Sequence, residues 1–191
     1  MIYGIYQNIR DAVWLCLIDN NIKTLPIPII SIANKYNIHV LKHSQTVQDY
    51  LKADESGTTI FVRNKIIIIY RDSESLQRCR FTIAHELGHI LLGHELTDDR
   101  YFRKFYTSKP EIEIEADVFA SRLLAPACVL WGLNLHTADE IAKACNITKE
   151  SAQVRADRME TLYKRNKFLT SPLEKQVFNN FRDFINQNKK Q

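Results

Sequence analysis

Hydrophobic residues recur at intervals of three and four positions in several stretches of the chain, the spacing of one face of an α-helix. The first stretch predicts an amphipathic helix from Tyr6 to Ile18, and a second helix follows Pro28. The apolar positions of this second helix are Ile29, Ile32, Ala33 and Tyr36. A longer helix with a buried face is expected over residues 76–91, where the repeating positions are Leu76, Cys79, Ile83, Leu87, Ile90 and Leu91. We expect these helices to pack inward.

Three short apolar stretches have the length and the β-branched content of strands, namely Ile38–Lys42, Thr58–Val62 and Lys65–Tyr70. Only Arg63-Asn64 separates the last two, so these two strands should form a β-hairpin. The three strands together predict a small sheet, either antiparallel or mixed. An extended peptide could add to the edge of such a sheet by β-augmentation.

The last third of the chain is predicted to be helical. Thr137-Ala138-Asp139-Glu140 has the pattern of a capping box, and Ser171-Pro172-Leu173-Glu174 repeats it with proline at the first helical position. Helices over Ala138–Cys145 and Lys149–Tyr163, joined by Asn146-Ile147-Thr148, would imitate a helix-turn-helix.

The composition is that of one ordered globular domain. The 191 residues are 45% hydrophobic and 10% aromatic, with only five glycines and five prolines. We therefore expect a single domain over residues 1–191. The net charge of +4 is spread along the chain, so it does not by itself indicate nucleic acid or a membrane as a partner.

The expected compartment is the cytoplasm. The segment from Met1 to Asp11 lacks the basic region and the apolar stretch of a secretory signal, and no apolar run approaches the ~18 residues of a membrane helix. The four cysteines form no CxxC pair and are expected to be free thiols; they are Cys16, Cys79, Cys128 and Cys145.

The pattern His85-Glu86-Leu87-Gly88-His89 carries the most specific chemistry in the chain. Two histidines four positions apart on a helix project from the same face and can bind one ion. A zinc ion held by three protein ligands keeps one position for water, and Glu86 would act as the general base on that water. His85 and His89 are therefore candidate zinc ligands, and Glu86 is the candidate catalytic group.

Chance has to be weighed against this interpretation. An HExxH pattern should occur by accident in on the order of one chain in a hundred of this size and composition. Its position on a half-buried helix, with Gly88 present despite a helix cost of ~1 kcal/mol, is hard to explain by packing alone. The context therefore favours a metal site.

The third ligand is sought in the acidic segment Glu111 to Asp117. Glu113 and Asp117 are four positions apart, so a second helix can turn both toward the histidines. Glu113 would complete a set of two histidines and one glutamate, while Asp117 would accept a hydrogen bond from the second ring nitrogen of a ligating histidine. Glu111 and Glu115 would instead complement the helix dipole, with Glu115 pointing away from the metal.

A metzincin site would continue the pattern with a glycine and a third histidine. The required positions hold Leu92 and Glu95, whereas Gly93 and His94 each come one residue early. His94 is therefore not expected to bind the metal, and is better explained as a histidine at the surface or beside a neighbouring side chain.

Three segments of the chain are Arg80-Phe81-Thr82-Ile83-Ala84-His85-Glu86-Leu87-Gly88-His89, then Glu113-x-Glu115-Ala116-Asp117-x-Phe119-Ala120, then Leu123-Leu124-Ala125-Pro126. In their residues, order and spacing they resemble the ImmA/IrrE family of metallopeptidases. The resemblance extends from the first helix through Leu162. It implies zinc held by His85, His89 and Glu113, with Asp117 completing the family's E-x-x-x-[DN] pattern. Ala125 stands where the family commonly has methionine, a departure that concerns packing more than chemistry.

The expected fold is α+β, with a small twisted β-sheet packed against a helical zincin core and followed by a helical C-terminal part. The N-terminal helices and the sheet would take residues 1–70, the zinc-binding helices residues 75–126, and the C-terminal helices residues 137–187, helix-turn-helix-like at 138–163. One Zn²⁺ per chain is expected, in a cleft lined by the sheet edge. The resemblance implies a protein substrate, typically a helix-turn-helix repressor of a mobile element or a stress regulon.

Two questions stay open at this level. The residue that stabilises the oxyanion is unassigned, although His94, Tyr101 and Tyr106 lie between the two metal motifs. A rival hypothesis is a DNA-binding regulator with a structural or vestigial metal site. Its basic residues would be Arg155, Arg158, Lys164 and Arg165.

Overall fold

The computed structural model describes residues 9–94 and 111–189. They belong to a mixed α+β fold, which confirms the expected fold class. The chain divides into two compact units: residues up to Ala12 together with Ile29–Ala120, and Val13–Pro28 together with the residues from Ser121 onward. The count of one domain over residues 1–191, with its internal boundaries, stays a prediction.

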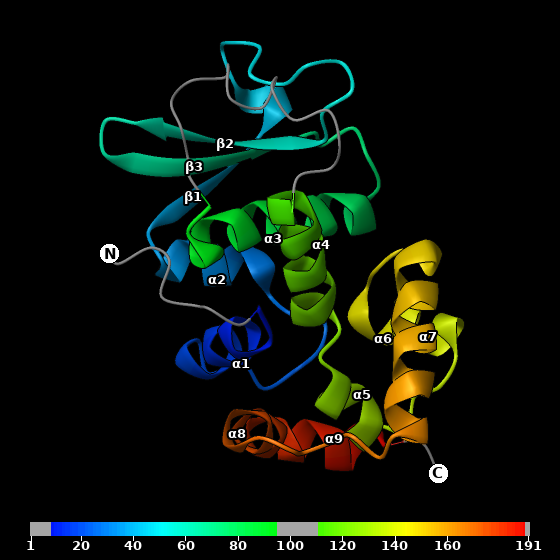
Figure 1. Cartoon of the computed structure of the whole chain (residues 1–191). Helices are drawn as coiled ribbons and strands as arrows, with labels where there is room; N and C mark the ends of the chain where they lie inside the picture. The colour runs from blue at the N-terminus through cyan, green and yellow to red at the C-terminus, as the bar shows by residue number, and fades with distance from the viewer. Residues whose placement is uncertain (1–8, 95–110, 190–191) are drawn as a thin grey trace. The chain divides into compact units, whose positions relative to one another are not determined.

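The sheet of the first unit has three strands in the order β1-β3-β2. β1 (Ile38–Lys42) pairs in parallel with β3 (Lys65–Tyr70), and β2 (Gly57–Val62) pairs with β3 in the antiparallel sense (Figure 1). Arg63 and Asn64 both have positive φ, 49° and 62°, as a two-residue hairpin turn requires. The predicted hairpin is confirmed, and the sheet is of the mixed kind.

Two helices of this unit pack against the sheet, α2 (Ile29–Lys35) and α3 (Leu76–Leu92). Ser75 begins α3, since its side chain accepts a hydrogen bond from the backbone N–H of Arg78. Most of the predicted apolar face of α3 is buried, but Leu76 is 63% exposed. Leu76 is the first residue of the helix and is mostly exposed, so its place in the buried face was wrong. A short 3₁₀ helix, η1 (His43–Gln45), follows β1.

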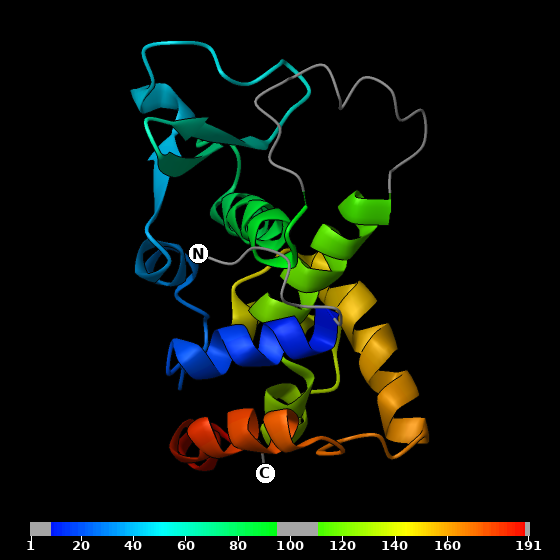
Figure 2. The same ribbon diagram turned by 60° about the vertical axis from the view of Figure 1, so that its left-hand side comes forward.

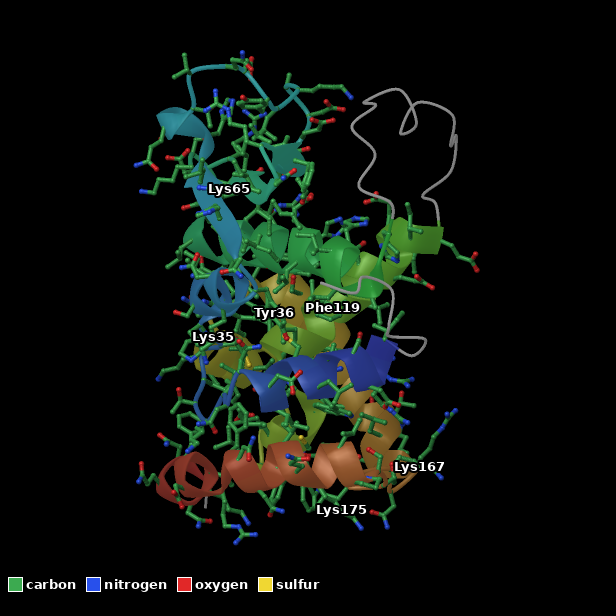
Figure 3. All side chains as sticks on the ribbon, turned by 90° about the vertical axis from the view of Figure 1, so that its left-hand side faces the viewer. Lys35, Tyr36, Lys65, Phe119, Lys167 and Lys175 are labelled. Atoms are coloured by element: carbon green, nitrogen blue, oxygen red, sulfur yellow. The ribbon has the colours of Figure 1, made fainter. Side chains whose placement is uncertain are left out.

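α4 (Glu111–Leu124) crosses close to α3, as two views of the ribbon show (Figures 1 and 2). The reason is Gly88. A Cβ atom there would lie 3.1 Å from the ring of Phe119 and 3.3 Å from the Cα of Ala116, so the missing side chain lets the two helices approach. Phe119 is fully buried, and its label in Figure 3 marks where the two helices meet.

The second unit is helical. Its elements, with α1 beginning in the first unit, are α1 (Ile9–Asp19), α5 (Ala127–Gly132), α6 (Ala138–Cys145), α7 (Lys149–Lys164), α8 (Pro172–Asn180) and α9 (Arg182–Asn188). The predicted α1 residues before Ile9 lie outside the described part. The capping box of Thr137 and Glu140 is confirmed. Ser171 also caps α8, but the carboxylate of Glu174 accepts from the backbone N–H of Thr170, one residue earlier than a capping box requires.

Arg155 takes no part in the exposed face of the helix-turn-helix-like pair α6 and α7. Its side chain is buried, 5% exposed, and its Nε donates a hydrogen bond of 2.7 Å to the backbone oxygen of Ala125. Burial lowers the pKa of this guanidinium to about 10. Arg158, Lys164 and Arg165 are exposed. Arg155 therefore joins α7 to the segment after α4 and is unavailable to a nucleic acid.

All four cysteines are buried thiols outside any disulfide, as predicted. Among the helices in the described ranges, none combines the length and the apolar character that a membrane span needs.

Candidate metal centre

His85 and His89 lie on the same face of α3, one turn apart. Their Nε2 atoms are 3.0 Å apart and their ring centroids 4.7 Å. Both side chains are mostly covered, with 17% and 5% of their surface exposed. The spacing of four residues therefore directs two ring nitrogens to one point, as the sequence predicted.

Glu113, in the first turn of α4, brings a carboxylate to the same point. One of its oxygens is 3.2 Å from His85 Nε2, and the other is 3.5 Å from His89 Nε2. Among the described residues, these three side chains form the group able to hold a metal ion, with donor atoms within 4.8 Å of one another.

The donor set and its spacing fit zinc. Bonds of about 2.0–2.1 Å in a tetrahedral arrangement place neighbouring donors about 3.3 Å apart. The three separations of 3.0, 3.2 and 3.5 Å lie around that value. A zinc ion could thus be accepted after shifts of a few tenths of an ångström.

Asp117, one turn after Glu113, contacts the other side of the His85 ring. The Nδ1–H of His85 donates to Asp117 Oδ1 over 2.9 Å, because a carboxylate can only accept. The arrangement is the one expected for Asp117 from its position in the second helix. It leaves His85 Nε2 turned toward Glu113.

These carboxylates strongly change the charge state of the cluster. Burial opposes protonation of His85, but its hydrogen bonds to Asp117 and Glu113, together with the charge of Glu86, outweigh that effect and raise the pKa of His85 from 6.5 to about 9. A hydrogen bond from His85 and the proximity of the His89 ring lower the pKa of Glu113 far below its usual range. The metal-free cluster therefore holds an imidazolium beside a carboxylate.

Glu86 is 4% exposed and stands outside the group of three donors. Its Oε2 accepts a hydrogen bond of 2.6 Å from the hydroxyl of Thr59, which comes from β2. Sequence reasoning missed Thr59. The contact joins residues 27 positions apart on a strand and a helix, and no spacing rule connects such residues.

His94 lies against His89, which agrees with its predicted place beside a neighbouring side chain. The Nδ1 atoms of the two rings are 3.0 Å apart, and His94 Nε2 is 2.9 Å from Glu115 Oε2. We expected Glu115 to point away from the metal site, and this was wrong. Its carboxylate contacts His94, which in turn contacts His89. The local signal was Gly93, which ends α3 in the left-handed region with φ 74° and turns the chain back.

The remaining candidates have simpler places. Glu111 is exposed in the first turn of α4, as a residue that complements the helix dipole should be. Tyr101 and Tyr106 lie outside the described residues.

Two helices thus supply two histidines and a glutamate, with a separate glutamate next to the first histidine, an arrangement typical of peptidases with an HExxH pattern. Residues 33–157 match the peptidase M78 family, described as the IrrE N-terminal-like domain. The match covers more than half of the chain, so the chain belongs to this family. It includes the HExxH pattern, Glu113 and Asp117. A comparison with curated proteins gave no match.

Proposed function

We propose that the protein is a zinc-dependent endopeptidase that hydrolyses a peptide bond in a specific protein substrate. The observation that carries this proposal is the convergence of His85, His89 and Glu113 on one point, with Glu86 next to His85 on α3. One zinc ion per chain fits this group of donors, the one found among the described residues. Four buried cysteine thiols outside any disulfide support the cytoplasm as the compartment.

Each residue has a distinct task in this proposal. Bound zinc supplies Lewis acidity, which makes a water molecule acidic near neutral pH and polarises a carbonyl. Glu86 takes a proton from the attacking water as its oxygen bonds to the carbonyl carbon, and passes it to the nitrogen as the C–N bond breaks. Thr59 holds one oxygen of Glu86, and Asp117 holds the ring of His85.

The substrate is proposed to lie along β2. This strand is at the edge of the described sheet, and Thr59 in its middle reaches Glu86. An extended peptide added to that edge would pass beside the general base. That the substrate is a helix-turn-helix repressor of a mobile element or a stress regulon rests on the family resemblance.

The metal assignment is tested by the zinc content of purified wild type and of Glu113→Gln. We expect about one zinc per chain in the wild type and a marked loss in the variant. Glu111→Gln is the matched control, since it removes the same charge from an exposed position of the same helix. No zinc in the wild type after metal is supplied would overturn the proposal.

The catalytic assignment is tested by Glu86→Gln. This variant should keep its zinc, because Glu86 is not one of the three donors, and should lose proteolysis of a repressor substrate. Full activity of Glu86→Gln would remove Glu86 from the mechanism.

DNA binding is the second candidate, favoured only by the shape of α6 and α7. The burial of Arg155 removes one of its four basic residues. Arg158, Lys164 and Arg165 are the exposed ones that could meet phosphates. Duplex binding with a steep salt dependence, weakened by Arg158→Ala, would support this function, while no binding at low salt would exclude it.

A further inference from the structure

His89 is the more buried of the two candidate histidine ligands, and its second ring nitrogen contacts another histidine where His85 contacts a carboxylate. His85 Nδ1 is 2.9 Å from Asp117, whereas His89 Nδ1 is 3.0 Å from His94 Nδ1. His94 is itself well covered, with 8% of its side chain exposed, and its other nitrogen contacts Glu115. Three side chains thus form a row that leads from the metal centre to a partly exposed carboxylate.

When the His94 ring is neutral, the direction of both hydrogen bonds in this row is fixed by what each atom can donate or accept. Glu115 as a carboxylate only accepts, so His94 Nε2 must carry a proton and donate it. In a neutral His94 ring the Nδ1 atom is then an acceptor, so His89 Nδ1–H donates to it. His89 is thereby held in the tautomer that leaves its Nε2 lone pair free, which is the atom that faces Glu113 and His85.

The end of α3 explains how His94 reaches this place. Gly93 adopts φ 74°, and its backbone N–H contacts the carbonyl of Ile90, while the backbone N–H of His94 donates to the carbonyl of His89. This is the Schellman arrangement, which reverses the chain after a helix. The reversal places the side chain of His94 over the last turn, where His89 lies.

We propose that His94 and Glu115 are positioning residues for His89, fixing its tautomer and ring orientation for metal binding through a carboxylate–histidine–histidine row. This inference rests on the proposed function, in that it takes His89 as a zinc ligand. Hydrogen bonds of this kind at a ligating histidine change metal affinity by about 10–100-fold. His89 is held by the neutral ring of His94, whereas His85 is held directly by the charged carboxylate of Asp117. The hydrogen bond at His89 is therefore the weaker of the two.

The first experiment measures zinc affinity by competition with a chelator, using zinc alone as the probe. His94→Leu removes both ring nitrogens and should weaken zinc binding about 10–100-fold. His94→Asn keeps an oxygen acceptor near the position of Nδ1, so it should recover a large part of that loss. Glu115→Gln should weaken binding less than Asp117→Asn does, because it acts through an intervening ring. Glu111→Gln, the same change on the exposed side of α4, should leave affinity unchanged.

The second measurement reports on tautomers and is independent of activity. In the zinc-loaded wild type, ¹⁵N NMR of the imidazoles should show His89 protonated at Nδ1 and His94 protonated at Nε2 alone. In Glu115→Gln the population of that His94 tautomer should fall. A merely structural role for His94 would change thermal stability without this signature.

The outcomes separate the two proposals. Wild type that binds one zinc, with His94→Leu binding it equally well, overturns the positioning role and leaves the peptidase proposal standing. A ¹⁵N shift that shows zinc on His94 itself also overturns it. If the wild type binds no zinc, the proposed function is overturned, and the positioning role, which depends on it, is overturned with it.

Discussion

Zinc has to displace a proton from His85, so its affinity for the site should rise with pH. In the metal-free cluster the ring donates from Nδ1 to Asp117 and lies 3.2 Å from Glu113 through Nε2, and these contacts raise the pKa of His85 to about 9. A ligating imidazole must have a free lone pair. The two carboxylates that prepare the site for a cation therefore also hold a proton in it.

The magnitude follows from the pKa. With a pKa of about 9, the protonated fraction of His85 falls enough between pH 7.5 and 8.5 to raise zinc affinity about eightfold. An imidazole with its ordinary pKa near 6.5 would change affinity only about 1.1-fold over the same interval. The two cases differ by about 1.2 kcal/mol in binding free energy, which a chelator competition resolves.

The assay that isolates His85 is an NMR titration of its imidazole in the metal-free protein, followed by the zinc competition at the two pH values. Asp117→Asn removes one charged acceptor, so it should lower the pKa of His85 and flatten the pH dependence of zinc affinity. A wild-type His85 that titrates near pH 6.5 would refute the reasoning, because Asp117 and Glu113 would then not stabilise the imidazolium.

Three further predictions concern stability and packing. Because the pKa of His85 is raised on folding, its contribution to stability is fully present below pH 6.5 and is lost as the pH rises through about 9. Urea unfolding of the metal-free protein should therefore show that the free energy of unfolding falls by on the order of 2 kcal/mol between pH 7 and 10. Gly88→Ala should push Phe119 and α4 away from α3 and weaken zinc binding about tenfold or more, and unchanged zinc affinity would contradict the packing argument. Arg155→Met should lower the free energy of unfolding by about 2–3 kcal/mol, because a buried carbonyl loses its donor, while the exposed control Arg158→Met should stay within about 0.5 kcal/mol.

Local patterns predicted the elements well where one short-range rule decided the structure. β1 and β3 have the expected bounds. Each begins directly after a residue with positive φ, Asn37 before β1 and Asn64 before β3, which interrupts the extended backbone. β2 begins one residue earlier than expected, at Gly57. The parallel pairing of β1 with β3 could not be predicted, since it depends on which edge the chain returns to after the intervening residues.

The site divides in the same way. His85 with His89, and Glu113 with Asp117, could be found because each pair obeys the four-residue spacing of a helix face. Glu115 is two positions from Glu113, which predicts opposite faces, and that inference was sound for α4 alone. The chain reversal at Gly93 brings His94 to that other face, so the partner of Glu115 comes from the segment that follows α3. Contacts between elements decide such cases, and a single sequence does not record them.

The two helices that supply the metal donors give the ion a mechanical role as well as a chemical one. His89 and Glu113 lie on α3 and α4, so a bound ion is a cross-link that closes the chain between them. Such a closure restricts the unfolded chain and resists separation of the helices. In the proposed zinc form, removal of the ion should therefore lower the resistance of these two helices to unfolding.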